Sequence, residues 1–307
     1  MKAFRRICYG FFSVSLFLFL LSKNREAATI INNTVSGLLR MSLSRVFSTL
    51  GFSFFEFLII LSPLVLLGLI CYGKTLVKIK NIIAVFLVIF SLYFLNLGVA
   101  YNAKTPLEKE GKITEGELIE LSEILLESVN LYSGEIKEKS PVEYGGVRVK
   151  ELAFSRALTH LRILGLYSFM TSEANVNNVL PSFMYYFTSF HEISHVLGYA
   201  REGEANLFSY IALKETGDEY FSFCADLYSL FLTLNFIKIS NENEYLRLWD
   251  LLSCLAKNEI AQYENCLILY PEWKIFRGLQ SSYSSAVDTP SYNDFLRLLY
   301  LYIFNCE

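Results

Sequence analysis

Residues 190–206 read FHEISHVLGYAREGEAN and contain two of the three histidines in the 307-residue chain. His191 and His195 are four residues apart, so a helix would place both imidazoles on one face, one turn apart. Two neutral imidazoles at this separation can bind one Zn²⁺ ion. Glu192 leaves the helix on an adjacent face, where it could take a proton from a water molecule on the metal. This HExxH pattern is typical of zinc peptidases and predicts a zinc site on a helix.

The residues after His195 predict a turn and a further metal ligand. Gly198 can end the helix in a left-handed cap, which lets the chain reverse. A catalytic zinc site needs one more protein ligand besides the two histidines. In metzincins that ligand follows at the position that Arg201 occupies here. An arginine stays protonated and cannot bind a cation, so the metzincin pattern is excluded.

Two glutamates beside Arg201 are the candidates for this third ligand. Glu202 is preferred, and Glu204 is the alternative. Asn206 follows Glu202 by one turn of the expected second helix, where its side chain could hydrogen-bond a ligand and fix its orientation. Three residues could stabilise negative charge on a substrate oxygen, and the sequence does not choose among them: Arg201, Tyr199 and Tyr210.

The composition favours a membrane part followed by a globular part. Apolar residues make up 53% of the chain, which is high for a soluble protein, and they are concentrated in the first hundred residues. The net charge is −3 without a long basic run, so nucleic-acid binding is not expected. The six cysteines form no CxxC pair, which argues against a cysteine zinc site. The four in the second half could form two disulfides or remain buried thiols.

Three apolar runs predict a membrane domain over residues 1–101. The runs cover residues 8–22, 51–73 and 81–101, and Glu56 is the one acid within them. Runs of this length can cross a bilayer as helices. The first run could instead belong to a cleaved signal peptide, but no small-x-small cleavage site follows it.

The charges around these runs predict an orientation. Between the runs, residues 31–50 have the spacing of an amphipathic helix on the membrane surface, or of an ordinary connecting helix. The positive-inside rule places the N-terminus and the lysine-rich loop 74–80 in the cytoplasm. We therefore expect a multi-pass protein of the cell membrane whose C-terminal domain is extracytoplasmic.

Residues 102–307 predict a mainly helical domain, so that the whole chain is all-α. A capping box at 114–117 begins a helix, and residues 133–149 are the one region where a hairpin is plausible. A helix over 149–164 and a polar loop over 171–178 follow. The apolar run near 225–237 is too short for a membrane and predicts a core helix. The remaining helices are expected at 181–197, 202–215, 217–238, 242–257, 259–284 and 290–305.

The stretch HEISHVLGYAREGEANLFSYIA resembles a family of bacterial membrane proteins known as domain of unknown function 3810. The segments NLGVAYNAKTP and TSEANVNNVLPSF are similar to it as well, so the resemblance covers most of the chain. It implies N-terminal spans followed by a zincin-like domain. The ExEAN piece is also similar to the ligand helix of the ImmA/IrrE-type metallopeptidases. In those enzymes the first glutamate of the piece binds the metal, which implies Glu202 here.

These observations predict a membrane-anchored zinc metallopeptidase that acts on a peptide or protein substrate. Zn²⁺ would be the cofactor, Glu192 the general base, and the lipid bilayer a partner. A non-catalytic zinc-containing membrane sensor or scaffold is the alternative, and an intramembrane protease is a third possibility. Glu173 and Asn175, ahead of the motif helix, could line the cleft or cap a helix.

Overall fold

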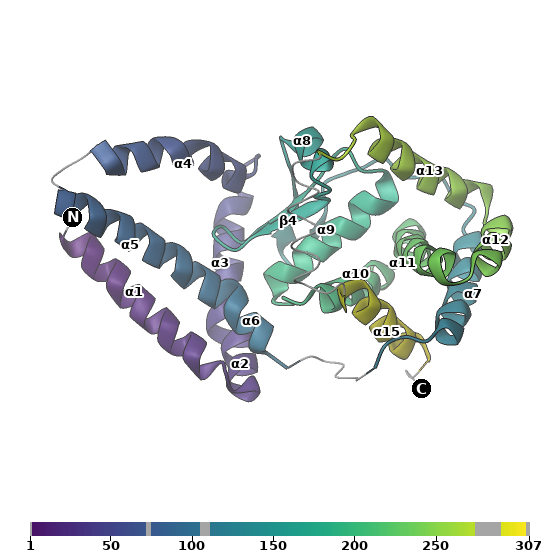
Figure 1. Cartoon of the computed structure of the whole chain (residues 1–307), viewed down its shortest axis with the longest axis horizontal. Helices are drawn as coiled ribbons and strands as arrows, with labels where there is room; N and C mark the ends of the chain where they lie inside the picture. The colour runs from purple at the N-terminus through teal and green to yellow at the C-terminus, as the bar shows by residue number, and fades with distance from the viewer. Residues whose placement is uncertain (1, 72–74, 105–110, 274–289, 305–307) are drawn as a thin grey trace.

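The computed structural model describes residues 2–71, 75–104, 111–273 and 290–304 and is 73% helical (Figure 1). Long helices extend to one side, and a rounder helical body with a small sheet forms the other side. The expectation of a mainly helical chain with long apolar helices is confirmed. Within the described residues, the helices long and apolar enough to cross a membrane are Ala3–Leu21, Ile79–Asn102 and Glu219–Ser240.

The N-terminal part contains the three predicted spans as helices. They are α1 (Lys2–Leu21), α4 (Phe54–Cys71), and one continuous helix formed by α5 (Thr75–Tyr93), the π-helical turn η2 (Phe94–Gly98) and α6 (Val99–Asn102). In Figure 1, α1 and α5 lie side by side and run in the same direction, while α4 runs back. The apolar stretch found in α4, Phe54–Gly68, is shorter than the predicted run 51–73.

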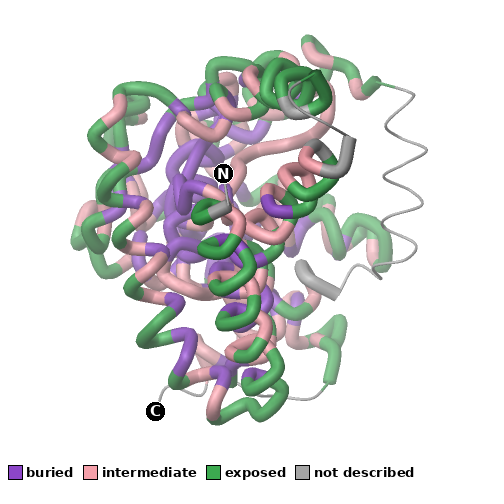
Figure 2. The backbone as a smooth tube through the Cα atoms, turned by 90° about the vertical axis from the view of Figure 1, so that its left-hand side faces the viewer, coloured by how far each residue is buried: buried purple, intermediate pink, exposed green. Residues whose placement is uncertain are grey.

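Helix α11 (Glu219–Ser240) has the hydropathy of a membrane span but lies in the globular body. Of its most apolar window, 67% is buried, against 11% for α1 and 33% for the α5–α6 helix. The prediction that residues 225–237 form a core helix is therefore confirmed. Figure 2 shows the same contrast, with buried positions gathered in the interior and the N-terminal helices largely exposed.

A second continuous helix lies between the two parts of the molecule. It consists of α2 (Arg25–Ile31), the π-helical turn η1 (Asn32–Ser36) and α3 (Gly37–Ser48), and it crosses the ends of the long helices (Figure 1). The helix is amphipathic as predicted, but its polar face is buried and its apolar face is exposed. The buried polar residues are Asn32, Ser36, Arg40 and Ser44, and the exposed apolar residues are Ile30, Val35, Leu38 and Val46.

Two small sheets lie in the globular part, among the described residues. Strands β1 (Glu143–Tyr144) and β2 (Val147–Arg148) form the hairpin expected within residues 133–149. The second sheet has the order β3-β5-β4, with β3 (Lys150–Glu151) parallel and β4 (Gly165–Ser168) antiparallel to β5 (Glu173–Val176).

This second sheet corrects two predictions. The helix expected over 149–164 is only α8 (Ser155–His160), because β3 precedes it. The expected polar loop over 171–178 contains the fully buried strand β5. Hydrogen bonds hold its polar residues in the interior: Glu173 accepts from backbone N–H groups of α4, and the amide nitrogen of Asn175 donates to the Leu166 carbonyl of β4. The Asn175 Oδ1 atom is buried without a partner among the described residues.

The remaining helices surround the motif helix α9. The expected capping box begins α7 (Glu115–Leu131). Helices α9 (Ser182–Leu197) and α10 (Glu202–Glu215) lie where predicted. The boundary between the predicted helices 242–257 and 259–284 lies earlier than expected, because Ser253 caps a new helix. Helix α12 is therefore Glu242–Leu251, and α13 is Cys254–Leu269. Residues 274–284 of the predicted helix lie outside the described residues, and α15 spans Pro290–Phe304.

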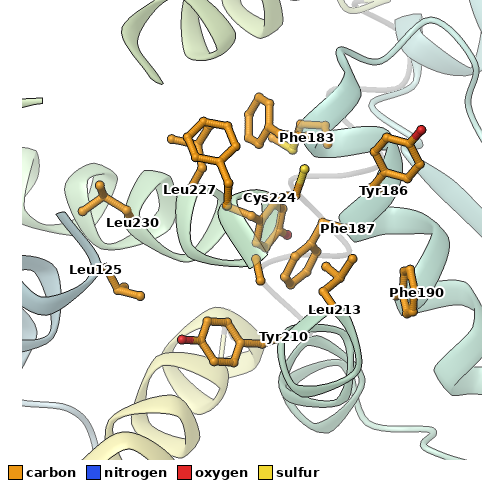
Figure 3. Packing of buried hydrophobic residues seen from close by; sticks show 14 of the residues in the cluster. Leu125, Phe183, Tyr186, Phe187, Phe190, Tyr210, Leu213, Cys224, Leu227 and Leu230 are labelled. Carbon is orange, nitrogen blue, oxygen red and sulfur yellow. The ribbon is translucent and has the colours of Figure 1, made fainter. Parts of the chain in front are cut away.

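The hydrophobic core forms where α9 packs on α10 and α11. Of the aromatic side chains of α9, Phe183 and Phe187 lie close to Cys224 and Leu227 of α11, whereas Tyr186 lies further away (Figure 3) and packs on Phe221. This core holds the motif helix from one side. Cys224, Cys254 and Cys266 are free thiols, so the described cysteines form no disulfide.

Candidate metal centre

The chain reversal after α9 brings the three predicted ligands together. Gly198 adopts φ 107° and ψ 12°, a left-handed conformation that ends α9 and that glycine adopts without strain. Helix α10 then begins at Glu202, beside the last turn of α9. The Nε2 atoms of His191 and His195 are 3.1 Å apart. The Glu202 carboxylate oxygens lie 3.0 Å from His191 Nε2 and 3.7 Å from His195 Nε2.

These separations fit a tetrahedral zinc site. Zinc bonds to nitrogen and oxygen of about 2.0–2.2 Å give tetrahedral edges of roughly 3.3 Å. The donor atoms of His191, His195 and Glu202 all lie within 4.8 Å of one another. Glu204 does not join this group, since its carboxylate accepts a hydrogen bond from Arg201 at 3.0 Å.

Hydrogen bonds fix both histidines in the tautomer that a metal requires. His195 Nδ1 lies 2.7 Å from the carbonyl oxygen of Tyr199, and His191 Nδ1 lies 2.8 Å from Asn206 Oδ1. Both oxygens are acceptors, so each Nδ1 carries a hydrogen and each Nε2 faces the other ring and Glu202. A metal ion at this point would take the lone pairs of both Nε2 atoms, in place of the hydrogen that His191 can donate to Glu202. The donor set therefore fits Zn²⁺, and Asn206 has the orienting position expected of it.

The charges at the site also suit a cation. Burial lowers the pKa of His195 to about 4, which keeps its imidazole neutral. Burial acts to raise the pKa of Glu202, but its hydrogen bond and charge interaction with His191 outweigh this and hold the pKa at about 2. Burial acts to lower the pKa of His191, but its hydrogen bond with Glu202 and the nearby carboxylate charges outweigh this and raise it, so a bound cation would replace the His191 proton. Imidazole and carboxylate together are a set of ligands that zinc accepts.

Glu192 lies between the ligands and strand β4. Its side chain is buried, and burial raises its pKa to about 8. The backbone N–H of Tyr167 in β4 donates a hydrogen bond to its carboxylate. A Cβ atom at Gly165 would lie 2.5 Å from Glu192 Oε1 and 2.6 Å from a carbon of Thr188. Gly165 is therefore needed for the close approach of β4 to Glu192, a role that the sequence did not reveal.

A cleft runs along β4 on both sides of the metal centre. One hollow, of about 250 Å³, lies towards Phe187 and Tyr228. The other, of about 270 Å³, lies towards Leu97 and Tyr101 at the end of the α5–α6 helix. Four residues line both hollows: Gly165, His191, Glu192 and Glu202.

The other predicted site residues lie outside this cleft. Glu173 accepts hydrogen bonds from the N–H groups of Phe54 and Phe55 at the start of α4, and it forms a buried ion pair of 2.6 Å with Lys150. It therefore caps α4 and does not line the cleft. Asn175 is buried in the sheet. Arg201 donates to Glu204 and to the Tyr101 carbonyl, linking α10 to the α5–α6 helix.

Two polar residues of the N-terminal part hold the end of α9, and the sequence analysis missed both. The buried guanidinium of Arg40 donates to the Val196 carbonyl at 2.9 Å and to Asn32 Oδ1 at 2.9 Å. The Asn32 amide donates to the Gly198 carbonyl at 3.3 Å. These carbonyls have no partner within the helix, and a cation there also complements the helix dipole. The polar spacing at 32, 36, 40 and 44 was the available signal.

The fold and the site define a mainly helical protein with long apolar helices and a candidate HExxH metal centre. The chain belongs to the family described as protein of unknown function (DUF3810), whose model matches residues 32–300. No curated protein matches the chain. No solved structure matches it either.

Proposed function

We propose that the protein is a membrane-anchored zinc-dependent peptidase of the gluzincin type. The observation that carries the proposal is the convergence of two histidine Nε2 atoms and the Glu202 carboxylate, with separations of 3.0–3.7 Å. His191, His195 and Glu202 would hold the ion. When bound, Zn²⁺ supplies Lewis-acid polarisation and a nucleophilic water near neutral pH.

The protein's own groups support peptide hydrolysis around such an ion. Glu192, buried beside the ligands, would accept a proton from the attacking water and return it to the leaving amine. Strand β4 is an edge strand among the described residues. The Leu164 carbonyl accepts a hydrogen bond from the N–H of Asn177, next to β5, so the alternation of an antiparallel pair turns the backbone groups of Gly165 and Tyr167 to the other edge. Because the Tyr167 N–H donates to Glu192, a substrate would pair with the Gly165 groups and the Tyr167 carbonyl. A substrate in extended form could add to this edge as a strand.

A specific observation also favours a second function, a non-catalytic zinc-containing sensor or scaffold. Arg40 and Asn32 connect the helix beside the membrane part to the end of the ligand helix. A metal centre connected in this way could transmit a change between the two parts without any chemistry. The residue that separates the two functions is Glu192, which the peptidase needs and the sensor does not.

Metal content and peptidase activity of the purified full chain in detergent micelles test the proposal. We expect one zinc per chain in the wild type, and loss of zinc in His191→Ala and Glu202→Gln. Glu204→Gln is the matched control and should keep its zinc. Glu192→Gln should keep zinc and lose cleavage of a random decapeptide library, read by mass spectrometry. Zinc retained by His191→Ala would refute the metal centre, and a Glu192→Gln variant as active as the wild type would refute the peptidase.

A further inference from the structure

We propose that the substrate is the extended segment of a membrane-anchored protein directly beside its own membrane span. This inference rests on the proposed peptidase function and specifies its substrate class. The observation behind it is that one wall of the cleft belongs to a membrane helix. Leu97 and Tyr101 line the same hollow as His191, His195 and Glu202.

The depth of Leu97 and Tyr101 in the membrane follows from the length of the helix that contains them. Ile79–Asn102 is 24 residues long, or about 36 Å at 1.5 Å per residue, whereas the hydrocarbon core is about 30 Å thick. A span of about 20 residues that begins after Lys80 ends near Ala100. Leu97 and Tyr101 therefore lie at the boundary between lipid and water, where tyrosine is enriched.

Charged residues near Tyr101 support its position at the boundary between lipid and water. Lys104 forms an ion pair of 3.0 Å with Glu26, at the start of α2. Lys23, two residues after the end of α1, places its ammonium group 4.6 Å from the Phe19 ring centroid. Both pairs lie at the end of α1 and α6 that faces the globular body (Figure 1). Water thus begins within one turn of Tyr101.

The metal centre is in direct contact with this boundary. Arg201, which immediately precedes the ligand Glu202, donates a hydrogen bond of 3.0 Å to the carbonyl of Tyr101. The second hollow opens between this contact and strand β4. A polypeptide paired with the free edge of β4 would pass the metal centre and reach Leu97 at the membrane boundary.

This geometry favours a polypeptide next to a span over a free soluble peptide. An extended chain covers about 3.3 Å per residue, so about ten residues already reach the thickness of the hydrocarbon core. We therefore expect the cleaved bond within about ten residues of the substrate's span. The free strand edge recognises a peptide backbone, which a lipid headgroup does not offer.

Three reporter libraries test the inference with the full-length wild type in liposomes. In the first, a random 12-residue segment directly follows a synthetic single span. In the second, a 40-residue Gly/Ser spacer separates the span from the random segment. In the third, the span is absent. New termini are read by mass spectrometry, with Glu192→Gln as the inactive control. The spacer library controls for the higher effective concentration that any membrane attachment produces.

We expect the first library to be cleaved about tenfold faster than the other two, because tethering alone would favour the first and second alike. Equal cleavage of the first and second libraries, or preferred cleavage of the soluble one, would overturn the inference and leave the peptidase standing. If no library is cleaved by zinc-loaded protein, the peptidase function itself fails. A matched pair of variants localises the effect: Tyr101→Ala should slow the first library more than the other two, and Phe90→Ala, exposed on the same helix, should slow none of them.

Discussion

The two ends of the ligand helix α9 are held in different ways. Its N-terminal half is enclosed by the globular body, where Phe183 is fully buried and Phe187 stacks on an aromatic ring of α11 at 3.6 Å. Its C-terminal end carries the metal ligands and is held largely by hydrogen bonds from another part of the chain. Arg40 and Asn32 of the helix beside the membrane part supply them.

Because the two ends are held differently, substitutions at each end should affect stability and the geometry of the site to different extents. Apolar packing at the first end contributes in proportion to the buried area and volume, so it stabilises the whole domain but makes no contact with the carbonyls beside the histidines. The hydrogen bonds at the second end fix the carbonyls of Val196 and Gly198, next to the Tyr199 carbonyl that orients His195. Substitutions at the first end should therefore change stability, and substitutions at the second end should change the metal site as well.

Phe183→Ala should have the largest effect on stability. Removing a fully buried aromatic side chain costs about 3–5 kcal/mol of unfolding free energy, because it leaves a cavity in the core. The zinc affinity of the molecules that remain folded should not change. Thermal unfolding in detergent and zinc titration measure the two quantities. Phe236→Ala, with a side chain 37% exposed on α11, is the control and should cost much less. A large loss of zinc affinity in folded Phe183→Ala would break the distinction between the two ends.

Gly198→Ala should come next and should act on both quantities. A left-handed alanine costs about 1–2 kcal/mol, and a Cβ atom here would also overlap Arg40 Nη2 and the Asn32 amide. Gly217→Ala separates the two causes, since Gly217 is also left-handed, at φ +72°, but no described atom lies within 4 Å of its added Cβ. We expect Gly198→Ala to lose more stability than Gly217→Ala and to lose zinc binding. Equal behaviour of the two variants would show that the Arg40 contact does not matter.

Asn206→Ala should leave stability nearly unchanged and weaken zinc binding. The side chain holds His191 through Nδ1 at 2.8 Å, and loss of such a partner lowers metal affinity by about 10–100-fold. Competition with a fluorescent chelator measures the affinity. Asn206→Asp keeps an oxygen acceptor and should restore most of the binding. An unchanged zinc affinity in Asn206→Ala would show that the turn at Gly198 orients the histidines without this contact.

Glu259→Gln should have the smallest effect, and only as a change in pH dependence. Glu259 of α13 is fully buried at the N-terminal end of α9 and accepts a hydrogen bond from the N–H of Phe183. Burial raises its pKa above the ordinary value. The folded state therefore binds its proton more tightly than the unfolded state does, and this stability is lost as the pH rises through the raised pKa.

Unfolding measured from about pH 4 to pH 7 checks this sign, since an ordinary glutamate titrates near pH 4.3. The stability of the wild type should fall relative to Glu259→Gln as the pH rises. Glu264→Gln, exposed on the same helix, is the control and should run parallel to the wild type. If the unfolding free energy of Glu259→Gln also changed with pH as that of the wild type does, the buried carboxyl would not titrate in this range.

Much of the fold could be predicted because periodicity and caps are local signals. The bounds of α10 and the capping box of α7 follow directly from neighbouring residues. The sheet could not be predicted, because β5 reads Glu-Ala-Asn-Val and its Glu173 is paired with groups far along the chain. The hydropathy of α11 likewise cannot distinguish lipid from protein as its surroundings.

The close approach of His191, His195 and Glu202 was predictable for the same reason, since the four-residue spacing and a glycine turn fix their relation. The roles of Gly165 and Arg40 could not be predicted, because each residue contacts α9 from another part of the chain. A local sequence pattern does not indicate such a contact. Arg40 lies 156 residues before Val196, and a basic residue between membrane spans is usually assigned to topology.

The separation of 156 residues between Arg40 and Val196 also has a consequence for biosynthesis. At about 5–20 residues per second, a ribosome needs roughly 10–30 s to make the partner of Arg40 after Arg40 itself. The polar stripe of the α2–η1–α3 helix has no protein partner at its Arg40 end for that time, so we expect it to remain in water at the membrane surface. We expect cysteines introduced at Ser36 or Ser44 to react with a water-soluble maleimide in ribosome-bound chains that end before α9, and to be protected once α9 is made. We therefore expect the stripe that holds the end of α9 also to keep this helix of the nascent chain out of the bilayer.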